Sequence, residues 1–214
     1  PWHCGEPVIG EGDIRLTTWI DFDERGPLYE AFPFAHRLEV EFRLSEDVLR
    51  TTYTIRNGSG QDLPYGFALH PYFTKLDGDD GTFVALPAAH VMEATEQLLP
   101  TGELIRTGGT DFDLSTPKAV GTLDFDTVFT GLSGRVGFEY RDSGLAVSLH
   151  ASEEFTHMVL YTPPGQPYFC MENQTCSTDA HNMTAKGFAK VAGLEIVAPD
   201  AERSGWVEYR SRDL

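Results

Sequence analysis

One carboxylate and one imidazole stand in this sequence where strands would present them to a small molecule. Glu172 follows the apolar residues 169–171 and precedes the polar residues 173–175, so we expect the strand to end there. His70 follows another apolar stretch and precedes Pro-Tyr-Phe at 71–73. Burial can tune both groups toward neutral pH, and aromatic faces pack well on the C–H side of a pyranose ring. The pattern indicates proton-transfer chemistry on a sugar.

Each residue alone also has a plain interpretation. A single His beside Pro in an apolar segment is commonly a hydrogen-bonded core or rim residue, and a Glu at a strand end is commonly solvated. The sequences of the two segments, taken together, favour a functional interpretation over the structural one. Gly-Phe-Ala-Leu-His-Pro-Tyr-Phe at 66–73 and Pro-Pro-Gly-Gln-Pro-Tyr-Phe-Cys-Met-Glu-Asn-Gln-Thr at 163–175 resemble two signature stretches of the aldose 1-epimerase (galactose mutarotase) family.

The resemblance implies an isomerase that interconverts the α and β anomers of a free hexose of the glucose or galactose type. In that reaction Glu172 would be the base at the C1 hydroxyl, and His70 would be the acid at the ring oxygen, so we expect the two to face each other across the sugar. Aromatic neighbours such as Tyr72 would partly desolvate the site and raise the pKa of the carboxyl. Neither a metal nor an organic cofactor is expected, because two positioned proton-transfer groups suffice for this barrier.

Further sugar-binding residues are expected from the same likeness. Asp126 lies in Asp-Phe-Asp-Thr-Val-Phe at 124–129, which is similar to the family segment whose aspartate hydrogen-bonds sugar hydroxyls. Its alternative is a solvated Asp at a strand edge. Gln174 would hold Glu172 or a sugar hydroxyl, with Asp179 or His181 supporting the loop. His157 is expected to be structural, although it lies at the start of a strand and its side chain could point into the cleft.

Alternating strands must position these residues. Leu38, Val40, Phe42 and Leu44 share one face of 37–44, and 49–56 alternates in the same way after a turn at Ser45-Glu46-Asp47, which predicts an antiparallel hairpin. A second hairpin is predicted from 136–140 and 145–150. Further strands are expected at 13–21, 82–86, 90–93, 125–130, 158–161, 194–197 and 206–209.

Many short strands punctuated by 21 Gly and 13 Pro predict an all-β sandwich of antiparallel sheets with very little helix. One short helical turn is expected to open at 177–181. The family resemblance adds the galactose mutarotase-like architecture, a large β-sandwich called a supersandwich, with the sugar in a cleft on one sheet. With 214 residues, the chain is expected to form a single domain over 1–214.

Charge and composition restrict the partners. Sixteen basic against 33 acidic residues leave a formal charge of −17, which repels phosphate backbones and anionic lipid surfaces. No run of about 18 apolar residues is present to span a bilayer. We therefore expect a small-molecule sugar as the partner, and neither nucleic acid nor a membrane.

Three cysteines, Cys4, Cys170 and Cys176, are too sparse for a secreted disulfide framework, so a reduced cytoplasm is the expected location. Cys170 and Cys176 flank Glu172, which raises the question of zinc. Their Cys-x5-Cys spacing lacks the short interval and the second pair that are typical of zinc sites, so no metal is predicted. Cys170 is interpreted as a small core residue.

The resemblance covers the chain from its first residues. Those first residues, however, resemble a part of the family sequence that lies well after its N-terminus. No match exists for the family's His-Gly element with a preceding Asn-Arg, and His3 is followed by Cys4. We expect the N-terminal segment that supplies the first strands, an arginine and another histidine to be missing, either because the chain is a fragment or because a natural form is short. A partner or a homodimer would cover the exposed edge strands.

Two other functions compete with the mutarotase interpretation. A hexose-6-phosphate 1-epimerase of the same fold needs clustered Arg or Lys to bind the phosphate. The candidate residues are scattered, mostly on solvent faces of strands: Arg25, Arg37, Arg43, Arg50 and Arg56. A sugar-binding or sensing module would keep the cleft without catalysis. Mutarotation assays and calorimetry with free and phosphorylated sugars distinguish the three.

Overall fold

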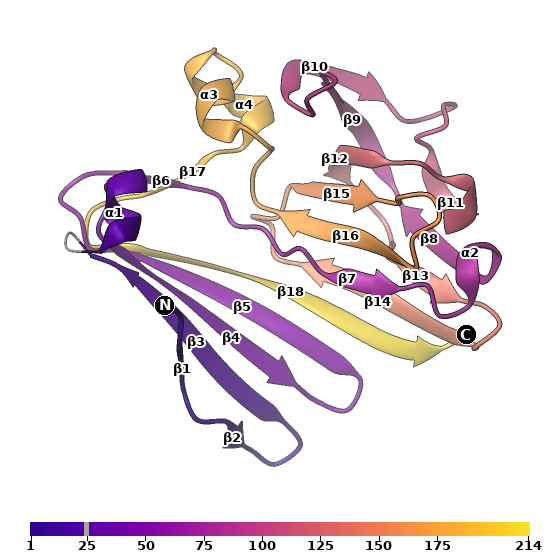
Figure 1. Cartoon of the computed structure of the whole chain (residues 1–214), viewed down its shortest axis with the longest axis horizontal. Coiled ribbons are helices and arrows are strands. Elements are labelled where there is room, and N and C mark those ends of the chain that lie inside the picture. Colours follow the sequence, from indigo (N-terminus) through magenta and orange to yellow (C-terminus); the bar gives the residue numbers. More distant parts are fainter. Residues whose placement is uncertain (24–25) are drawn as a thin grey trace. The chain divides into compact units, whose positions relative to one another are not determined.

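A computed structural model describes residues 1–23 and 26–214 (Figure 1). The chain divides into two compact units, one formed by 1–65 with 195–210 and the other by 66–194 with 211–214. Both are built almost wholly from antiparallel strands, which confirms the predicted all-β class. The expectation that 1–214 folds as a single domain stays a prediction.

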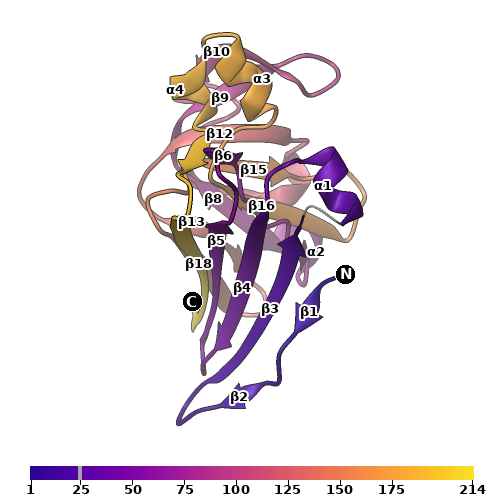
Figure 2. The ribbon, with the colours of Figure 1, turned by 90° about the vertical axis from the view of Figure 1, so that its left-hand side faces the viewer.

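The first unit is an antiparallel meander. Strand β3 pairs with β4, β4 with β5, and β5 with β18, while the short strands β1 and β2 both pair with β3. Figure 2 shows β3, β4 and β5 side by side. The elements are β1 His3–Cys4, β2 Val8–Ile9, β3 Ile14–Phe22, α1 Pro27–Ala31, β4 His36–Leu44, β5 Val48–Asn57, β6 Leu63–Tyr65, β17 Glu195–Val197 and β18 Glu202–Asp213.

The predicted hairpin of this unit is confirmed. Strands β4 and β5 pair in one register from His36 opposite Asn57 to Leu44 opposite Leu49. Because side chains alternate across a strand, Val40 and Tyr53 are buried on one face while charged residues lie on the other.

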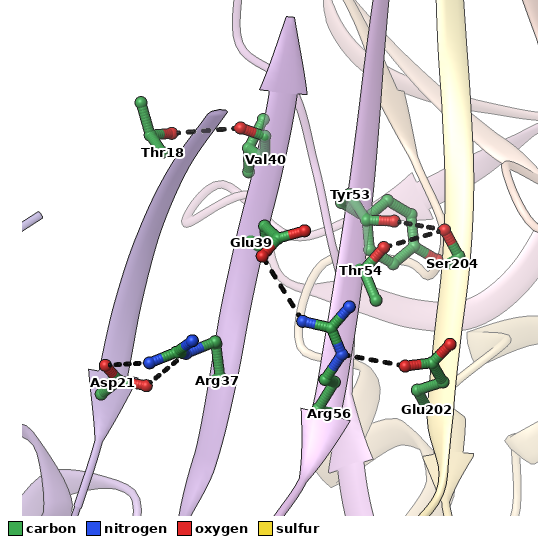
Figure 3. Close-up of polar contacts among 10 residues, drawn as sticks. All are labelled: Thr18, Asp21, Arg37, Glu39, Val40, Tyr53, Thr54, Arg56, Glu202 and Ser204. Carbon is green, nitrogen blue, oxygen red and sulfur yellow. Dashed lines mark hydrogen bonds and ion pairs between the residues drawn. The ribbon is translucent and has the colours of Figure 1, made fainter. Parts of the chain in front are cut away.

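Figure 3 shows cross-strand ion pairs on the charged face. Arg37 Nε lies 2.6 Å from Asp21 Oδ1, and Arg56 contacts both Glu39 (3.4 Å) and Glu202 (2.9 Å). These arginines are neutralised by neighbours on the adjacent strands.

The second unit is a sandwich. One layer has the strand order β10-β9-β12-β15-β16-β7, and the other contains β14-β13-β8-β11. The strands are β7 Tyr72–Thr74, β8 Thr82–Leu86, β9 Ala88–Ala94, β10 Pro100–Arg106, β11 Leu114–Ala119, β12 Asp126–Leu132, β13 Val136–Tyr140, β14 Leu145–Ala151, β15 His157–Tyr161 and β16 Tyr168–Gln174.

Aromatic side chains join the two layers of this sandwich. Phe138 of β13 packs against Phe73 of β7 and Phe169 of β16, with ring centroids 4.6 and 5.2 Å apart. The three rings pack between the two layers and bury one face of the six-stranded layer. The second layer does not cover the other face. The predicted second hairpin is confirmed as β13 and β14, which pair from Val136–Leu149 to Tyr140–Leu145.

Helices are few and short, as predicted. Besides α1, they are α2 Gly78–Gly81, the 3-10 turn η1 Val120–Thr122, α3 Ala180–Ala185 and α4 Ala189–Ala192. The helical turn expected from 177–181 begins at Ala180. Met183 and Ala192 of α3 and α4 pack with Met92 of β9 in a small buried cluster. None of the helices in the described ranges is long and apolar enough to cross a membrane.

Candidate active site

Strand β16 carries the predicted carboxylate in its interior. The strand continues to Gln174, so the expectation that it ends at Glu172 is wrong by two residues. Alternation places Cys170, Glu172 and Gln174 on one face, and Phe169 and Met171 are fully buried on the other. The carboxylate therefore projects away from the aromatic core.

The chain before β7 brings the predicted imidazole to this carboxylate. Ala68 bridges Gln174, and Tyr72 pairs with Cys170, so the same antiparallel register places His70 opposite Glu172 (β7 and β16 in Figure 1). A backbone hydrogen bond from Leu69 N–H to the Asn173 carbonyl (3.1 Å) fixes this register. Two segments distant in the sequence thus meet as neighbouring strands.

His70 and Glu172 are in direct contact. Nε2 of His70 lies 3.1 Å from Oε1 of Glu172, and the side chains are 54% and 8% exposed, respectively. The sequence interpretation expected them to face each other across the sugar. They lie side by side instead, because opposed residues of adjacent antiparallel strands project in the same direction.

Burial sets the protonation of Glu172. Removal from water raises its pKa above the ordinary value, and the negative charge of Asp126 raises it further, whereas the nearby His70 acts in the opposite direction. The net direction is upward, as predicted from the sequence. A carboxyl group of this kind exchanges protons closer to neutral pH than an exposed glutamate does.

Tyr72 forms an aromatic wall beside the pair. Its ring stacks on His70 with centroids 4.9 Å apart and planes inclined by 12°, and it meets Tyr168 edge-on at 5.0 Å. Tyr72 is itself exposed, so the ring is accessible at the site. The expected aromatic surroundings are therefore present.

Asp126 shares the same face of the sheet. It pairs with Tyr161, which in turn pairs with Cys170, so the three lie in one row across β12, β15 and β16. Asp126 and Glu172 both line a hollow of about 690 Å³. The structure thus brings Asp126 to the predicted cleft, where it is exposed to solvent.

Gln174 also lines this hollow. Its Oε1 is buried and accepts no hydrogen bond from residues 1–23 or 26–214. A buried amide oxygen without a partner is costly, so a ligand hydroxyl that donates to it would be favoured.

Several lining residues were missed from the sequence, above all Tyr161 and Val159 of β15. The predicted strand 158–161 contained them, but only the register with β12 and β16 shows that they share the face of Glu172. Residues of β9, β10 and the loops beside them also line the hollow. The missed lining residues are Val91, Met92, Glu93, Ala94, Thr95, Leu98, Pro100, Ile105, Phe112, Thr127, Val128, Val159, Tyr161 and Thr178.

His157 is structural, as predicted. It is buried on β15, and its ring nitrogens contact the Val191 carbonyl of α4 (3.0 Å) and the Thr156 hydroxyl (2.8 Å). Burial lowers the pKa of His157, so the neutral ring is favoured. Asp179, just before α3, accepts a hydrogen bond from Asn182 and so supports the loop that follows β16.

Cys170 is fully buried, in agreement with its interpretation as a small core residue. Burial, followed by the charges of Glu172 and Asp126, raises the pKa of its thiol to about 12. A thiol of this kind stays protonated and is not a nucleophile.

The hollow has an acidic lining. Glu93, Asp126 and Glu172 contribute to it, and among the described residues that line it none is Lys or Arg. The arginines considered for phosphate binding lie in the first unit, where each contacts a carboxylate; these are Arg37, Arg43, Arg50 and Arg56. Arg25 lies outside the described residues.

Comparison with known proteins places the chain in a family. The family model described as aldose 1-epimerase matches residues 1–210. The chain belongs to the aldose 1-epimerase family. This membership confirms the resemblance inferred from 66–73 and 163–175, and it supports an isomerase-type enzyme whose family binds sugars.

Solved structures with a similar fold are distant from this chain in sequence. A galactose mutarotase-like protein from Clostridium acetobutylicum has 19% identity and a TM-score of 0.87, over 100% of this chain and 67% of that one. The Slr1438 protein from Synechocystis sp. PCC 6803 has 26% identity and a TM-score of 0.79, over 100% and 66%. These likenesses confirm the galactose mutarotase-like fold.

A curated relative is similar at the sequence level. It is the uncharacterized protein YphB of Escherichia coli (strain K12), 22% identical over 193 residues, which are 87% of this chain. The chain spans 61% of the length of that relative.

Proposed function

We propose that this protein is an aldose 1-epimerase that interconverts the α and β anomers of a free hexose. The observation that carries the proposal is the contact between His70 and Glu172 at the floor of an open hollow. The pair supplies both an acid and a base, and the pKa of Glu172 is shifted in the direction that a base working near neutral pH requires.

The reaction follows from these two groups. Glu172 removes the proton from the C1 hydroxyl while protonated His70 donates a proton to the ring oxygen, so that the C1–O5 bond breaks and C1 becomes an aldehyde. After rotation about C1–C2, the O5 hydroxyl attacks the other face of the aldehyde. Its proton returns to His70, and Glu172 returns its proton to the new C1 hydroxyl. Both residues end the cycle in their starting states.

The side-by-side arrangement requires the sugar to lie over both residues. C1 and the ring oxygen are bonded to each other, so neighbouring groups on one sheet face can reach both at once. The contact between His70 and Glu172 would then be replaced by contacts to O5 and O1. The half-exposed His70 side chain can make that adjustment, whereas Glu172 is held by burial.

The remaining residues that line the hollow suit a neutral sugar. We assign hydrogen bonds with hydroxyl groups to Asp126 and Gln174, both of which line the hollow. Tyr72 offers a ring face for the C–H side of the pyranose. The same acidic surroundings disfavour a phosphorylated hexose, because a phosphate group would meet carboxylates without an arginine or lysine among the described lining residues.

Location and assembly are further parts of the proposal. The three cysteines form no disulfide, which suits the reduced cytoplasm expected from the sequence. A homodimer stays a prediction. Light scattering, which measures the molar mass in solution, tests it.

Polarimetry tests the function. Freshly dissolved α-D-glucose, α-D-galactose and α-D-glucose 6-phosphate are followed with and without the protein, and the spontaneous rate is subtracted. We expect acceleration with one or both free hexoses and much less with the phosphate. Acceleration confined to the phosphate would favour the 6-phosphate epimerase. Calorimetric binding of a free hexose without acceleration would identify a binding module.

A further inference from the structure

A third side chain lies next to the His70–Glu172 pair. The ligand-forming atoms of His70, Cys170 and Glu172 all lie within 4.8 Å of one another. Cys170 precedes Glu172 by two residues and so shares its face of β16, while the antiparallel register brings His70 to both. Imidazole, thiolate and carboxylate are the three ligand types that zinc takes in proteins.

The spacing is close to that of a coordinated ion. Typical zinc bond lengths of about 2.0 to 2.3 Å place tetrahedral ligand atoms roughly 3.3 to 3.6 Å apart. Nε2 of His70 and Oε1 of Glu172 are already 3.1 Å apart. Since all three ligand atoms lie within 4.8 Å of one another, a movement of about 1 Å would bring the set to tetrahedral spacing.

The surroundings favour a cation. Glu93 and Asp126 line the same hollow, and its described lining includes neither Lys nor Arg. Negative groups around a partly enclosed site raise the local concentration of cations. A phosphate or carboxylate ligand would be repelled by the same charges.

We propose that His70, Cys170 and Glu172 form an inhibitory site for a thiophilic divalent cation of the zinc class. The protein supplies three ligands, and the fourth position faces the hollow. On binding, the cation displaces the thiol proton of Cys170 into solvent and takes up the Glu172 carboxylate and the His70 nitrogen. The binding part stands by itself, whereas the inhibition rests on the proposed mutarotase function.

Ligand softness determines which ions act. A thiolate selects Zn²⁺, Cd²⁺ or Co²⁺ over Mg²⁺ and Ca²⁺, which prefer oxygen ligands. Zinc should therefore inhibit where magnesium at the same concentration does not. Cys176 provides a matched control, because it lies on the same segment but outside the three-residue group.

Binding is tested without any activity assay. The full chain with Cys4→Ser, which removes an exposed thiol, is titrated with CoCl₂ and, by calorimetry, with ZnCl₂. We expect one ion per chain and a sulfur-to-cobalt charge-transfer band. Cys170→Ser and Cys170→Ala should lose the band and weaken zinc binding more than about tenfold, the least expected when a direct ligand is removed. Cys176→Ser should keep both, and circular dichroism confirms folding.

Equal bands in the Cys170 and Cys176 variants, or no band in any folded protein, would overturn the site. Inhibition is read from mutarotation rates with ZnCl₂, MgCl₂ and EDTA. We expect at least a tenfold slowing by zinc, reversal by EDTA, and a tenfold higher requirement for zinc in Cys170→Ser. If zinc binds as expected to an active protein without slowing it, the inhibitory role is wrong. If the metal-free protein never accelerates mutarotation, the proposed function fails while the metal site stands.

Discussion

Two buried glutamates, one in each unit, have opposite electrostatic environments. The side chains of Glu208 in the first unit and Glu172 in the second are each 8% exposed. Burial alone would raise the pKa of Glu208, but Arg210 and Arg50 together lower it. Glu172 contacts His70 and has a raised pKa, chiefly because it is buried. The partner, rather than the burial, decides whether the pKa of a buried carboxylate is lowered or raised.

The same contrast extends to the surroundings of the two glutamates. A hollow of about 970 Å³ in the first unit is larger than the one at Glu172 and is lined by Asp21, Arg37 and Arg56 among others. Its charges are already paired across the strands, as Figure 3 shows. In the second unit, Glu172 contacts His70, and no described Arg or Lys pairs with the carboxylates that line the hollow. The two hollows therefore differ in whether arginines balance their carboxylates, and not only in size.

The largest effect that would sharpen this contrast is expected at His70. His70→Gln removes the proton donor and should lower kcat for hexose mutarotation on the order of 10²- to 10⁴-fold. His150→Gln, an exposed histidine on β14, is the control and should leave the rate unchanged. Polarimetry measures both, and a His70→Gln protein as active as the control would remove His70 from the mechanism.

A smaller effect is expected at Asp126. Asp126→Asn should lower kcat/KM by about 10- to 100-fold through a lost charged hydrogen bond to the sugar. Because Asp126 raises the pKa of Glu172, the acid limb of the pH profile should also move to lower pH. Asp124→Asn, an exposed neighbour, is the control for both readings. A limb that stays in place would show that the two carboxylates are not coupled.

The paired glutamate should affect stability instead. Glu208→Gln leaves Arg50 and Arg210 without their shared carboxylate and should lower the free energy of unfolding by about 1 to 2 kcal/mol, since both arginines are partly exposed. Urea denaturation measures the loss, and mutarotation should be unchanged. A variant as stable as the parent would mean that the ion pairs contribute nothing.

The smallest effect concerns the stability of Glu172→Gln. Because the folded pKa of Glu172 is raised, its contribution to stability is fully present below the unfolded pKa and is lost as pH rises through the folded pKa. The variant should therefore match the parent near pH 4 and exceed its stability at pH 8. Thermal unfolding at both pH values provides the comparison, and a variant that is less stable at pH 8 would contradict the sign.

Much of the fold could be predicted from alternation. The hairpins around 45–47 and 141–144 were visible because apolar residues fall on every second position of strands buried on one face. Strands β10 and β11 were missed, since Gly102 and Pro117 interrupt them and both ladders contain register irregularities. The helical pair α3 and α4 was only half anticipated, because tertiary packing on Met92 stabilises it.

The candidate site, like the fold, has features that the sequence predicts and features that it does not. Glu172, His70 and Asp126 were predicted from short sequence motifs that resemble those of a family. All three residues line one hollow. Their side-by-side placement, the row from Asp126 through Tyr161 to Cys170, and the proximity of Cys170 to His70 depend on register between strands distant in sequence. A one-residue slip would reverse every face, so no local pattern contains that information.

One measurement tests the central claim most directly. Glu172→Gln and Glu208→Gln are prepared in parallel, and kcat/KM for the mutarotation of the preferred free hexose is determined beside the unfolding temperature of each. The account predicts that Glu172→Gln stays folded and loses about 10²-fold or more in rate, while Glu208→Gln keeps the parent rate. A folded Glu172→Gln protein with the parent rate would contradict it.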